Sequence, residues 1–242
     1  MMKAPFVFLL LSQSFFATQA VHAASLRVSP TIVEVPSSGS ASTLRLHNPG
    51  SGSASIQVRV YRWTQSDGSD QLTATDSVVA SPPIATLSAG KSQVVRIVRV
   101  SKALIQGEES YRILVDEIPN RKAAPKNAVM LAVRHSIPLF FGASAGAPNS
   151  LAWSIERSGN FLICVVRNSG DQRVRLAELE LRDVNGNLIA QRDGLVGYVL
   201  GQSRMSLPVP SYGKLLIGDS IEISALTENG PIRTTGKIVA RD

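Results

Sequence analysis

The sequence predicts an all-β protein made of two β-sandwich domains, and three observations support this prediction. Apolar and polar residues alternate with a period of two along many segments, clusters of Gly, Pro, Asn and Ser separate these segments, and no stretch of about 11 residues or more has a helical period. The stretch from Lys102 to Glu109 comes nearest, with room for one helical turn. A length of 242 residues, 44% of them hydrophobic and 18% charged, suits one or two globular domains.

Residues 1–23 have the three parts of a secretory signal peptide. Lys3 provides a basic start, an apolar run begins at Pro5, and small residues precede a cleavage site that we place after Ala23. The apolar run is about half the ~20 residues that a membrane-spanning helix needs. We therefore expect export. Because a single cysteine, Cys164, remains, we expect the exported chain to fold without disulfides.

Strand patterns fill the first half of the exported chain. They are separated by turn signals such as Asn48-Pro49-Gly50 and Ser66-Asp67-Gly68. The last of these strands is a long β-rich run that only Pro138 interrupts. The clearest strand segments are Ser55–Trp63, Val94–Val100, Tyr111–Glu117 and Asn127–Phe141.

A run of small residues, Gly142–Asn149, marks the predicted linker between the domains. The predicted first domain covers residues 24–143 and the second covers residues 149–242, and each is long enough for a seven-stranded sandwich. Asn185-Gly186 and Asn229-Gly230 are typical of hairpin turns. The strands expected in the second domain are Leu151–Glu156, Phe161–Arg167, Arg173–Arg182, Leu188–Gln191, Arg204–Val209, Ser220–Leu226 and Ile232–Val239.

Several residues look chemical but are better explained by structure, so we expect neither an enzyme nor a cofactor or metal site. Gly142–Gly146 matches the G-x-S-x-G nucleophile elbow around Ser144, but no helix pattern and no histidine follow it. His47 lies at a turn and His135 on a strand, while Cys164 lies in an apolar strand that favours a buried, inert thiol. Asp183–Asn187 has only part of the ligand set of a calcium loop.

The chain has a net charge of +7, several of its arginines lie at scattered strand positions rather than in a run, and aromatic residues make up only 5% of the chain. A nucleic-acid surface would cluster basic residues with stacking aromatics, so we expect no nucleic-acid partner. Two interpretations of the arginines remain open. They lie on solvated strand faces, or a few of them line a cleft that binds a carboxylate, for which the guanidinium group is well shaped.

The segment Ser81–Lys91, which runs into Val94-Val95-Arg96-Ile97, resembles the periplasmic chaperones of the chaperone–usher pilus pathway. Asp116-Glu117-Ile118-Pro119 and the ending Ile137–Phe141 fit the same family, as does the opening Ser29-Pro30-Thr31. The segment Arg134-His135-Ser136-Ile137-Pro138 is most similar to the sequences of the archaic, spore-coat-related branch. The resemblance is strong over residues 25–141 and loose afterwards.

The resemblance implies a boomerang of two immunoglobulin-like sandwiches in the periplasm. In this family, the first domain lends an edge strand to pilus subunits, which are then delivered to an outer-membrane usher without cofactor or ATP. The matching residues in this chain are Val129, Leu131 and Val133. Alternation alone leaves open whether these three side chains enter a subunit or face the protein's own core. An exposed donor strand also favours self-association of the free protein.

Two family features have no counterpart here. The basic pair that anchors the subunit's terminal carboxylate aligns with Ile32 and Pro138, neither of which binds an anion through its side chain. We expect Arg112, Arg134 or Arg27 to replace that pair. Glu117 matches a position of the interdomain contact, but Gly142 stands where its arginine partner is expected.

One other function is compatible with the same architecture. A secreted β-sandwich adhesion or structural module would show the same strand patterns and the same signal peptide. Such a module would lack a strand in its own domain or appear on the cell surface, and the sequence shows no missing strand.

Overall fold

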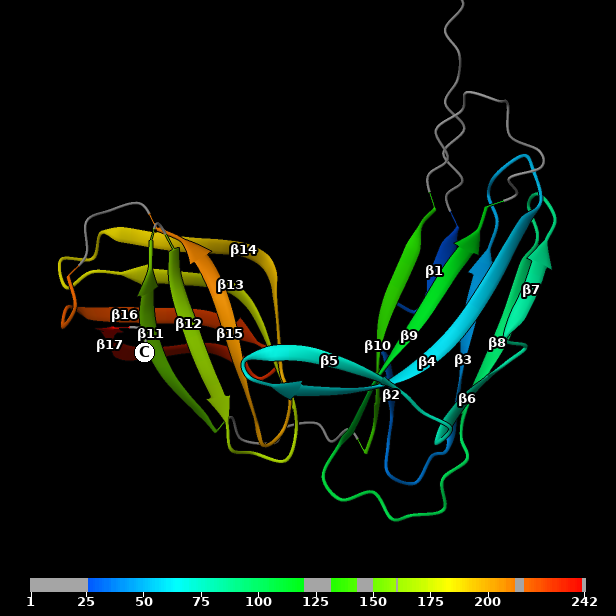
Figure 1. The fold of residues 1–242 in the computed structure, drawn as a ribbon, viewed down its shortest axis with the longest axis horizontal. Coiled ribbons are helices and arrows are strands. Elements are labelled where there is room, and N and C mark those ends of the chain that lie inside the picture. Colours follow the sequence, from blue (N-terminus) through cyan, green and yellow to red (C-terminus); the bar gives the residue numbers. More distant parts are fainter. Residues whose placement is uncertain (1–25, 120–131, 143–149, 160, 212–215, 241–242) are drawn as a thin grey trace, which may run out of the picture.

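The computed structural model describes residues 26–119, 132–142, 150–159, 161–211 and 216–240. Within these ranges every regular element is a β-strand, and the strands form two β-sandwich domains set at an angle to each other (Figure 1). The predicted fold class is therefore confirmed. No helix in the described ranges is long and apolar enough to cross a membrane. The predicted signal peptide and most of the predicted linker lie outside the described residues, so the domain boundaries stay predictions.

The prediction of a helical turn at Lys102–Glu109 was wrong. This stretch is an irregular loop, and Glu109 already begins the next strand. The loop is held by Arg99, whose guanidinium group donates hydrogen bonds to the carbonyls of Ser101 and Ala103 at 2.6 and 2.8 Å. Those carbonyls are thus satisfied by a side chain, and the backbone needs no helical hydrogen bonds there.

The first domain packs two sheets face to face. One sheet has the strand order β1-β3-β8-β6, and the other has the order β2-β10-β9-β4-β5, with β7 also pairing with β4. The strands of this domain are β1 (Arg27–Ser29), β2 (Val33–Val35), β3 (Ala41–His47), β4 (Ala54–Ser66), β5 (Ser69–Ala74), β6 (Val78–Ser81), β7 (Ile84–Leu87), β8 (Ser92–Arg99), β9 (Glu109–Ile118) and β10 (Arg134–Phe141).

The alternation seen in the sequence places one face of each strand in the core. Ile56 on β4 and Ile113 on β9 are fully buried, and Leu44 and Ile97 meet them from the opposite sheet. Side chains of a strand point alternately to its two faces, so the intervening residues lie on the outer faces. On β9, for example, Arg112 lies on the outer face of its sheet.

The second domain forms a second, separate core. Its seven strands follow the order β14-β13-β16-β17-β11-β12-β15, and Cys164 is fully buried among their aliphatic side chains. The predicted segments all coincide with strands. These are β11 (Leu151–Ser158), β12 (Phe161–Asn168), β13 (Val174–Arg182), β14 (Leu188–Val199), β15 (Ser203–Pro210), β16 (Ser220–Thr227) and β17 (Gly230–Ala240).

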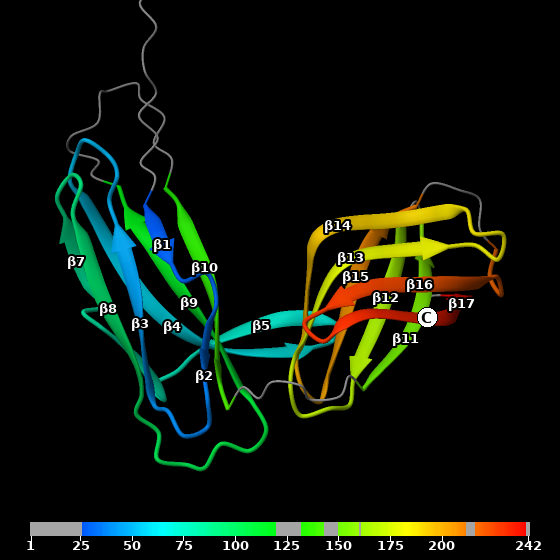
Figure 2. The same ribbon diagram turned by 180° about the vertical axis from the view of Figure 1, so that it is seen from behind.

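A long hairpin of the first domain reaches the second domain. Strands β4 and β5 extend beyond their sandwich, and their connecting turn lies against the other domain (Figure 2). At the tip, the carbonyl of Gly68 accepts a hydrogen bond from the backbone N–H of Ser206 at 2.9 Å. Gly68 has a φ of 73°, and a Cβ atom there would collide with the Ser206 side chain. This close approach requires glycine.

Candidate functional site

Strand β10 has an open edge over most of its length. On one side it pairs with β9 from Arg134 to Phe141, and on the other side the short strand β2 covers only Leu139 to Phe141. Among the described residues, 134–138 therefore have no second neighbouring strand. An exposed edge of this kind offers unpaired backbone groups to another chain.

The opposite sheet ends beside this edge with a short strand of its own. Strand β1 pairs only with β3 within the described part of the chain, and three residues, Pro30, Thr31 and Ile32, connect it to β2. Within the described ranges, the sandwich is thus closed beside β10 only at the end where β2 lies.

The inward face of β10 continues a row of core residues toward the open end of the strand. Ile137, Leu139 and Phe141 belong to the core of the first domain, and Val133 and His135 lie half-buried on the same face. Val133, one of the three predicted donor residues, is therefore the last described member of this row. Val129 and Leu131 lie outside the described residues, so their role stays a prediction.

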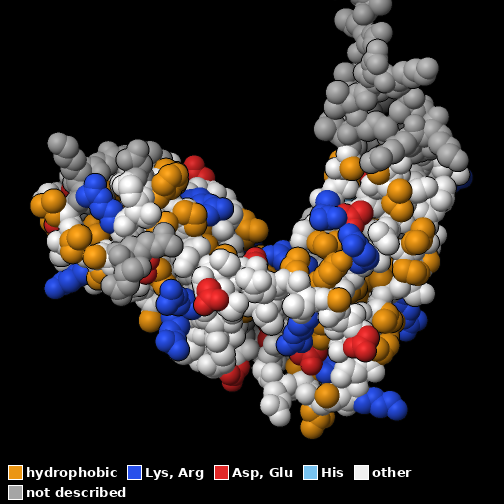
Figure 3. Space-filling view, in the orientation of Figure 1, with side chains coloured by type: hydrophobic (Ala, Val, Ile, Leu, Met, Phe, Trp, Pro, Cys, Tyr) orange, Lys and Arg blue, Asp and Glu red, His pale blue; other side chains and the backbone are white. Residues whose placement is uncertain are grey.

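A cleft of about 420 Å³ lies between the two domains, next to the end of the open edge. In the space-filling view, basic side chains gather on the side of the first domain that faces the second (Figure 3). The two domains contribute almost equally to the cleft. Its lining consists of Thr31, Ile32, Arg112, Ser136 and Pro138 from the first domain and Arg175, Leu195, Val196, Gly197 and Tyr198 from the second.

Arg112 is a largely buried cation in the lining of this cleft. Its side chain is 17% exposed, and its guanidinium carbon lies 3.7 Å from the ring centroid of Trp63 and 6.0 Å from that of Tyr198. The nearest carboxylate, on Asp70, is 4.0 Å away. Burial lowers the pKa of Arg112, with Asp70 and Tyr198 opposing the shift. No described residue accepts a hydrogen bond from this guanidinium, so its donors remain available for an anion.

Arg175, which the sequence did not single out, brings a second positive charge from the other domain. It is exposed on β13 and lines the same cleft as Arg112. Burial raises the pKa of Tyr198, and the positive charges of Arg173, Arg112 and Arg175 oppose that shift. The cleft therefore holds two arginines around one tyrosine, a set of donors suited to a carboxylate.

The other two candidate anchors lie elsewhere in the first domain. Arg134 is ion-paired with Asp116 on the outer face of the sheet, where Arg59 also donates to Asp116 at 2.6 Å. Burial alone would raise the pKa of Asp116, but the hydrogen bonds from Arg134 and Arg59 lower it below its usual value. Arg27 is exposed on β1, opposite His47. Neither Arg134 nor Arg27 lines the cleft.

Glu117 lies near the end of β9 that is remote from the second domain. Its backbone N–H donates to the carbonyl of Val133, and its side chain interacts electrostatically with His135. Burial raises the pKa of Glu117, and the charge of His135 opposes this. One carboxylate oxygen of Glu117 and Nε2 of His135 are buried without a hydrogen bond to any described residue.

The ion pairs between the domains come from Arg173 instead. Its guanidinium group pairs with Glu34 and Glu108 of the first domain and stacks on Phe140, 3.7 Å from the ring centroid. The Glu108 side chain is only 1% exposed. Burial raises the pKa of Glu108, while the charge and hydrogen bonds of Arg173 act against that shift.

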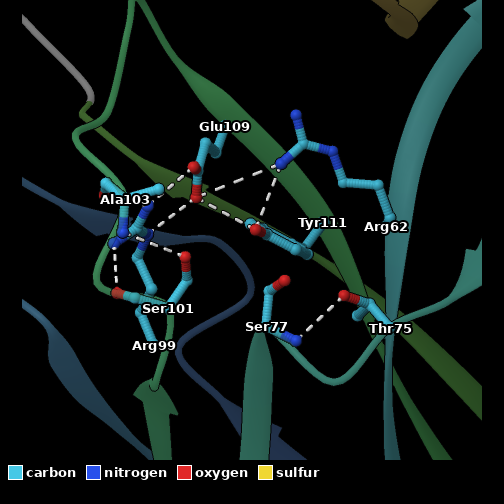
Figure 4. A network of polar contacts seen from close by, with 8 residues as sticks. All are labelled: Arg62, Thr75, Ser77, Arg99, Ser101, Ala103, Glu109 and Tyr111. Carbon is cyan, nitrogen blue, oxygen red and sulfur yellow. Dashed lines mark hydrogen bonds and ion pairs between the residues drawn. The ribbon is translucent and has the colours of Figure 1, made fainter.

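A polar network holds the loop that carries Glu108. Arg99 forms a two-pronged pair with Glu109 at 2.8 Å, and the Tyr111 hydroxyl donates to the same carboxylate at 3.0 Å (Figure 4). Arg62 in turn donates to the Tyr111 hydroxyl at 3.1 Å. Because Arg99 is also bonded to the loop carbonyls, the loop is fixed against the sheet and presents Glu108 to Arg173.

The hairpin tip and an aromatic cluster complete the joint between the domains. The side chain of Gln65 donates to the carbonyl of Tyr198 at 2.8 Å and accepts from the N–H of Leu200 at 2.9 Å. Trp63 and Phe140 pack against Tyr198 with ring centroids 5.7 and 5.8 Å apart. The walls of the cleft are therefore held in place by contacts on both sides of it.

Two of the residues that looked chemical in the sequence, Cys164 and His47, have structural surroundings. Burial raises the pKa of the Cys164 thiol to about 12, so it is not a nucleophile at neutral pH. His47 shares a hydrogen bond of 3.1 Å with the Ser92 hydroxyl. Ser144 lies outside the described residues. The described part of the chain has no group of three or more His, Cys, Asp or Glu residues placed to hold a metal ion.

Comparison with known structures shows the same fold in other proteins. One is the CsuC chaperone in its pre-assembly complex with the tip subunit CsuE, from the archaic chaperone–usher Csu pili of Acinetobacter baumannii. It is 22% identical, the match covers 90% of this chain and 100% of that one, and the TM-score is 0.65. The YadV chaperone is 19% identical, with coverages of 88% and 98% and a TM-score of 0.60. The Salmonella enterica structure of SafA pilin with the SafB chaperone matches with 22% identity, coverages of 89% and 98% and a TM-score of 0.58.

Comparison of sequences identifies the family. Residues 25–145 match the family described as "Pili and flagellar-assembly chaperone, PapD N-terminal domain". The probable fimbrial chaperone LpfB of Escherichia coli O157:H7 is 31% identical over 171 residues, which cover 67% of this chain and 69% of that protein. The chain therefore belongs to the family of pilus-assembly chaperones, as the motifs around Ser81–Lys91 and Ile137–Phe141 predicted.

Proposed function

We propose that this protein is a periplasmic chaperone of the chaperone–usher pathway, which binds pilus subunits by lending them a β-strand and delivers them to an outer-membrane usher. The observation that carries the proposal is the open edge of β10, which leads directly into the arginine-lined cleft. An edge strand and an anion site placed in line suit a partner that is an extended chain with a carboxyl terminus.

The open edge would supply hydrogen-bond partners to a subunit that lacks one strand of its sandwich. A sandwich without one strand exposes unpaired backbone groups and an apolar groove, both of which favour aggregation. A donated strand pairs these groups and fills the groove with alternate side chains. Val129, Leu131 and Val133 form that set, and each aliphatic side chain buried in a subunit would contribute about 1.5–3 kcal/mol. The position of Val133 on the inward face, in line with Ile137, supports this choice of face.

The cleft would bind the terminal carboxylate of the subunit. Arg112 and Arg175 supply donors from two domains, and the guanidinium of Arg112 has no other hydrogen-bond acceptor among the described residues. A carboxylate bound there has its chain running back along β10 toward Arg134. The subunit strand would therefore run parallel to β10, in the same direction as β2.

Relatives support the choice of partner. Two similar structures are complexes of a chaperone with a pilus subunit, CsuE in one case and SafA in the other. The predicted signal peptide, residues 1–23, supports export to the periplasm. Strand exchange needs no cofactor, ATP or catalytic group, because a stronger donor strand can replace that of the chaperone at the usher.

Co-expression with a candidate subunit tests the proposal. We expect the subunit to be soluble and to co-purify with the wild-type protein, and we expect Leu131→Asp to abolish this because a carboxylate cannot enter an apolar groove. Met130→Asp is the matched control, since it places the same charge on the other face of the predicted strand. If the subunit stays equally soluble with Leu131→Asp, the donor-strand role is wrong.

A further inference from the structure

We infer that Pro138 makes the cleft selective for chains that end there, so that the protein distinguishes a free carboxyl terminus from an internal segment. This inference rests on the proposed function, because it concerns the strand that would pair with β10. It concerns specificity, however, and it can fail while the proposed function stands.

Two hydrogen bonds fix the direction of the backbone groups along β10. The N–H of Glu117 on β9 donates to the carbonyl of Val133 at 3.1 Å, and the N–H of Gly142 donates to the carbonyl of Val35 beside β2 at 2.9 Å. Directions alternate along a strand, so odd-numbered residues address β9 and even-numbered residues address the outer edge.

At the open edge, Arg134 and Ser136 therefore each offer one N–H and one carbonyl. Pro138 offers no donor, because proline has no backbone N–H, and the parallel pairing of Leu139 with Val33 turns the Pro138 carbonyl toward the N–H of Val33 at the start of β2.

The space beside β10 is closed just beyond Pro138. Strand β2 begins to pair at Leu139, and the preceding residues Thr31 and Ile32 line the cleft. A chain that pairs with Arg134 and Ser136 cannot continue along β10, and it must either end at Pro138 or turn away into the cleft.

The missing N–H decides between these two cases. In a parallel pair, the N–H at position 138 would bond the carbonyl of the residue that arrives there. An internal residue would leave its carbonyl without that donor, and a buried carbonyl without a partner is costly. A terminal residue has a carboxylate instead. Arg112 stands directly opposite Pro138 on β9, and Arg175 faces the same cleft.

A simpler explanation is that Pro138 only protects a free edge from aggregation, since proline is common on edge strands. The two explanations predict different behaviour toward a lengthened partner. If Pro138 only protects the edge, lengthening the partner chain should not change its binding. If Pro138 selects the terminus, the lengthened chain should bind more weakly.

The test compares a subunit that has its natural carboxyl terminus with the same subunit extended by Gly-Ser. The measured quantity is the ratio of the two dissociation constants. We expect the wild-type protein to favour the natural terminus at least about tenfold, because one charge-assisted hydrogen bond is worth about that much. Pro138→Ala restores the N–H and should lower the ratio about threefold or more, chiefly by improving binding of the extended subunit. A carboxylate already held by arginine gains less from the new donor.

Two variants control this experiment. Pro138→Val restores the same N–H with a β-branched side chain, so it gives a second measurement if Pro138→Ala folds poorly. Arg112→Gln should weaken the natural subunit and leave the extended one nearly unchanged. An unchanged ratio in folded Pro138→Ala and Pro138→Val, judged by their urea midpoints, overturns the inference. If the wild-type protein binds neither subunit, the proposed function itself is wrong.

Discussion

Arg112 and Pro138 lie directly opposite each other on β9 and β10, at the point where the open edge of the sheet meets the interdomain cleft. Arg112 supplies a guanidinium group that has no hydrogen-bond acceptor among the described residues, and Pro138 lacks a backbone N–H. In the proposed complex, their proximity would bring the end of the bound subunit strand and a positive charge to the same place. Under the proposed function, Arg112 would replace the basic residues that the resemblance implied at the positions of Ile32 and Pro138.

Replacement of Arg112 should weaken subunit binding directly. We expect Arg112→Ala to lower the yield of co-purified subunit about tenfold or more, because it removes a charge-assisted contact from a partly desolvated site. Arg45→Ala is the control, since Arg45 is exposed on β3, in the other sheet. Wild-type recovery of the subunit with Arg112→Ala would remove this residue from the binding site.

Arg175 should act on the same carboxylate from the second domain. Arg175→Ala is expected to weaken binding by a smaller factor than Arg112→Ala, because Arg175 is exposed and its charge is better screened by solvent. The effect should disappear when the subunit carries an amidated carboxyl terminus. If Arg175→Ala weakens the amidated and free forms equally, its role is not the binding of the terminus.

Arg173 should stabilise the contact between the domains through its ion pairs. Arg173→Ala leaves Glu108 buried without a partner, and we expect it to lower the free energy of unfolding by about 3–5 kcal/mol. Arg182→Ala breaks an ion pair with Glu180 whose side chains are 39% and 42% exposed, and it should cost less than about 1 kcal/mol. Urea denaturation measures both. Equal losses would show that the Arg173 pair does not act as a buried one.

The hairpin tip should be intolerant of any side chain. Gly68→Ala and Gly90→Ala both place alanine at a positive φ, 73° and 69°, so they share the cost of a strained backbone, about 1 kcal/mol. Only at Gly68 does the new Cβ also meet Ser206, because Gly90 has open space around it. We expect Gly68→Ala alone to change the angle between the domains, seen as a larger radius of gyration in small-angle X-ray scattering. An unchanged radius would show that the tip does not set the angle.

Acidification should weaken the network around Glu109. The hydrogen bond from Arg99 lowers the pKa of Glu109, against the opposing effect of burial, and Tyr111 adds to the lowering. A carboxyl whose pKa is lower in the folded state stabilises the protein above its unfolded pKa, about 4.3, and this stabilisation is lost as the pH falls toward the folded value.

The pH dependence can be isolated by comparing two variants. The stability lost between pH 6 and pH 3 should be smaller in Glu109→Gln than in the wild type, whereas Glu222→Gln, on the exposed face of β16, should behave like the wild type. A loss in Glu109→Gln as large as in the wild type would contradict the assignment. Urea unfolding at both pH values supplies the measurement.

The sandwich strands could be predicted from the sequence because their pattern is local. Alternation along Ser55–Trp63 and Tyr111–Glu117 reports directly which side chains are buried, and the family motifs placed β10 and its open edge. The loop at residues 100–108 could not be predicted in the same way. Its shape depends on Arg99, which lies in a strand and bonds the loop through its side chain.

The joint and half of the cleft depend on contacts between residues far apart in the chain. Arg173 and Arg175 flank the apolar Val174, so the alternation in the sequence predicts that both lie on the solvent-exposed face of a strand. In the structure, one forms an interdomain ion pair and the other lines the cleft. Likewise Gln65 lies near a polar turn, and only the packing of the second domain against it gives it partners in Tyr198 and Leu200.

In the proposed complex, the start of β2 at Val33, immediately after the cleft-lining Ile32, would fix the last residue of every bound subunit at the same position. Clients of different length and composition would be aligned by their last residue, and their side chains would alternate between the two faces of the sheet in a phase counted backward from that residue. Sequence preferences among clients should therefore become visible only when their sequences are aligned from the carboxyl end.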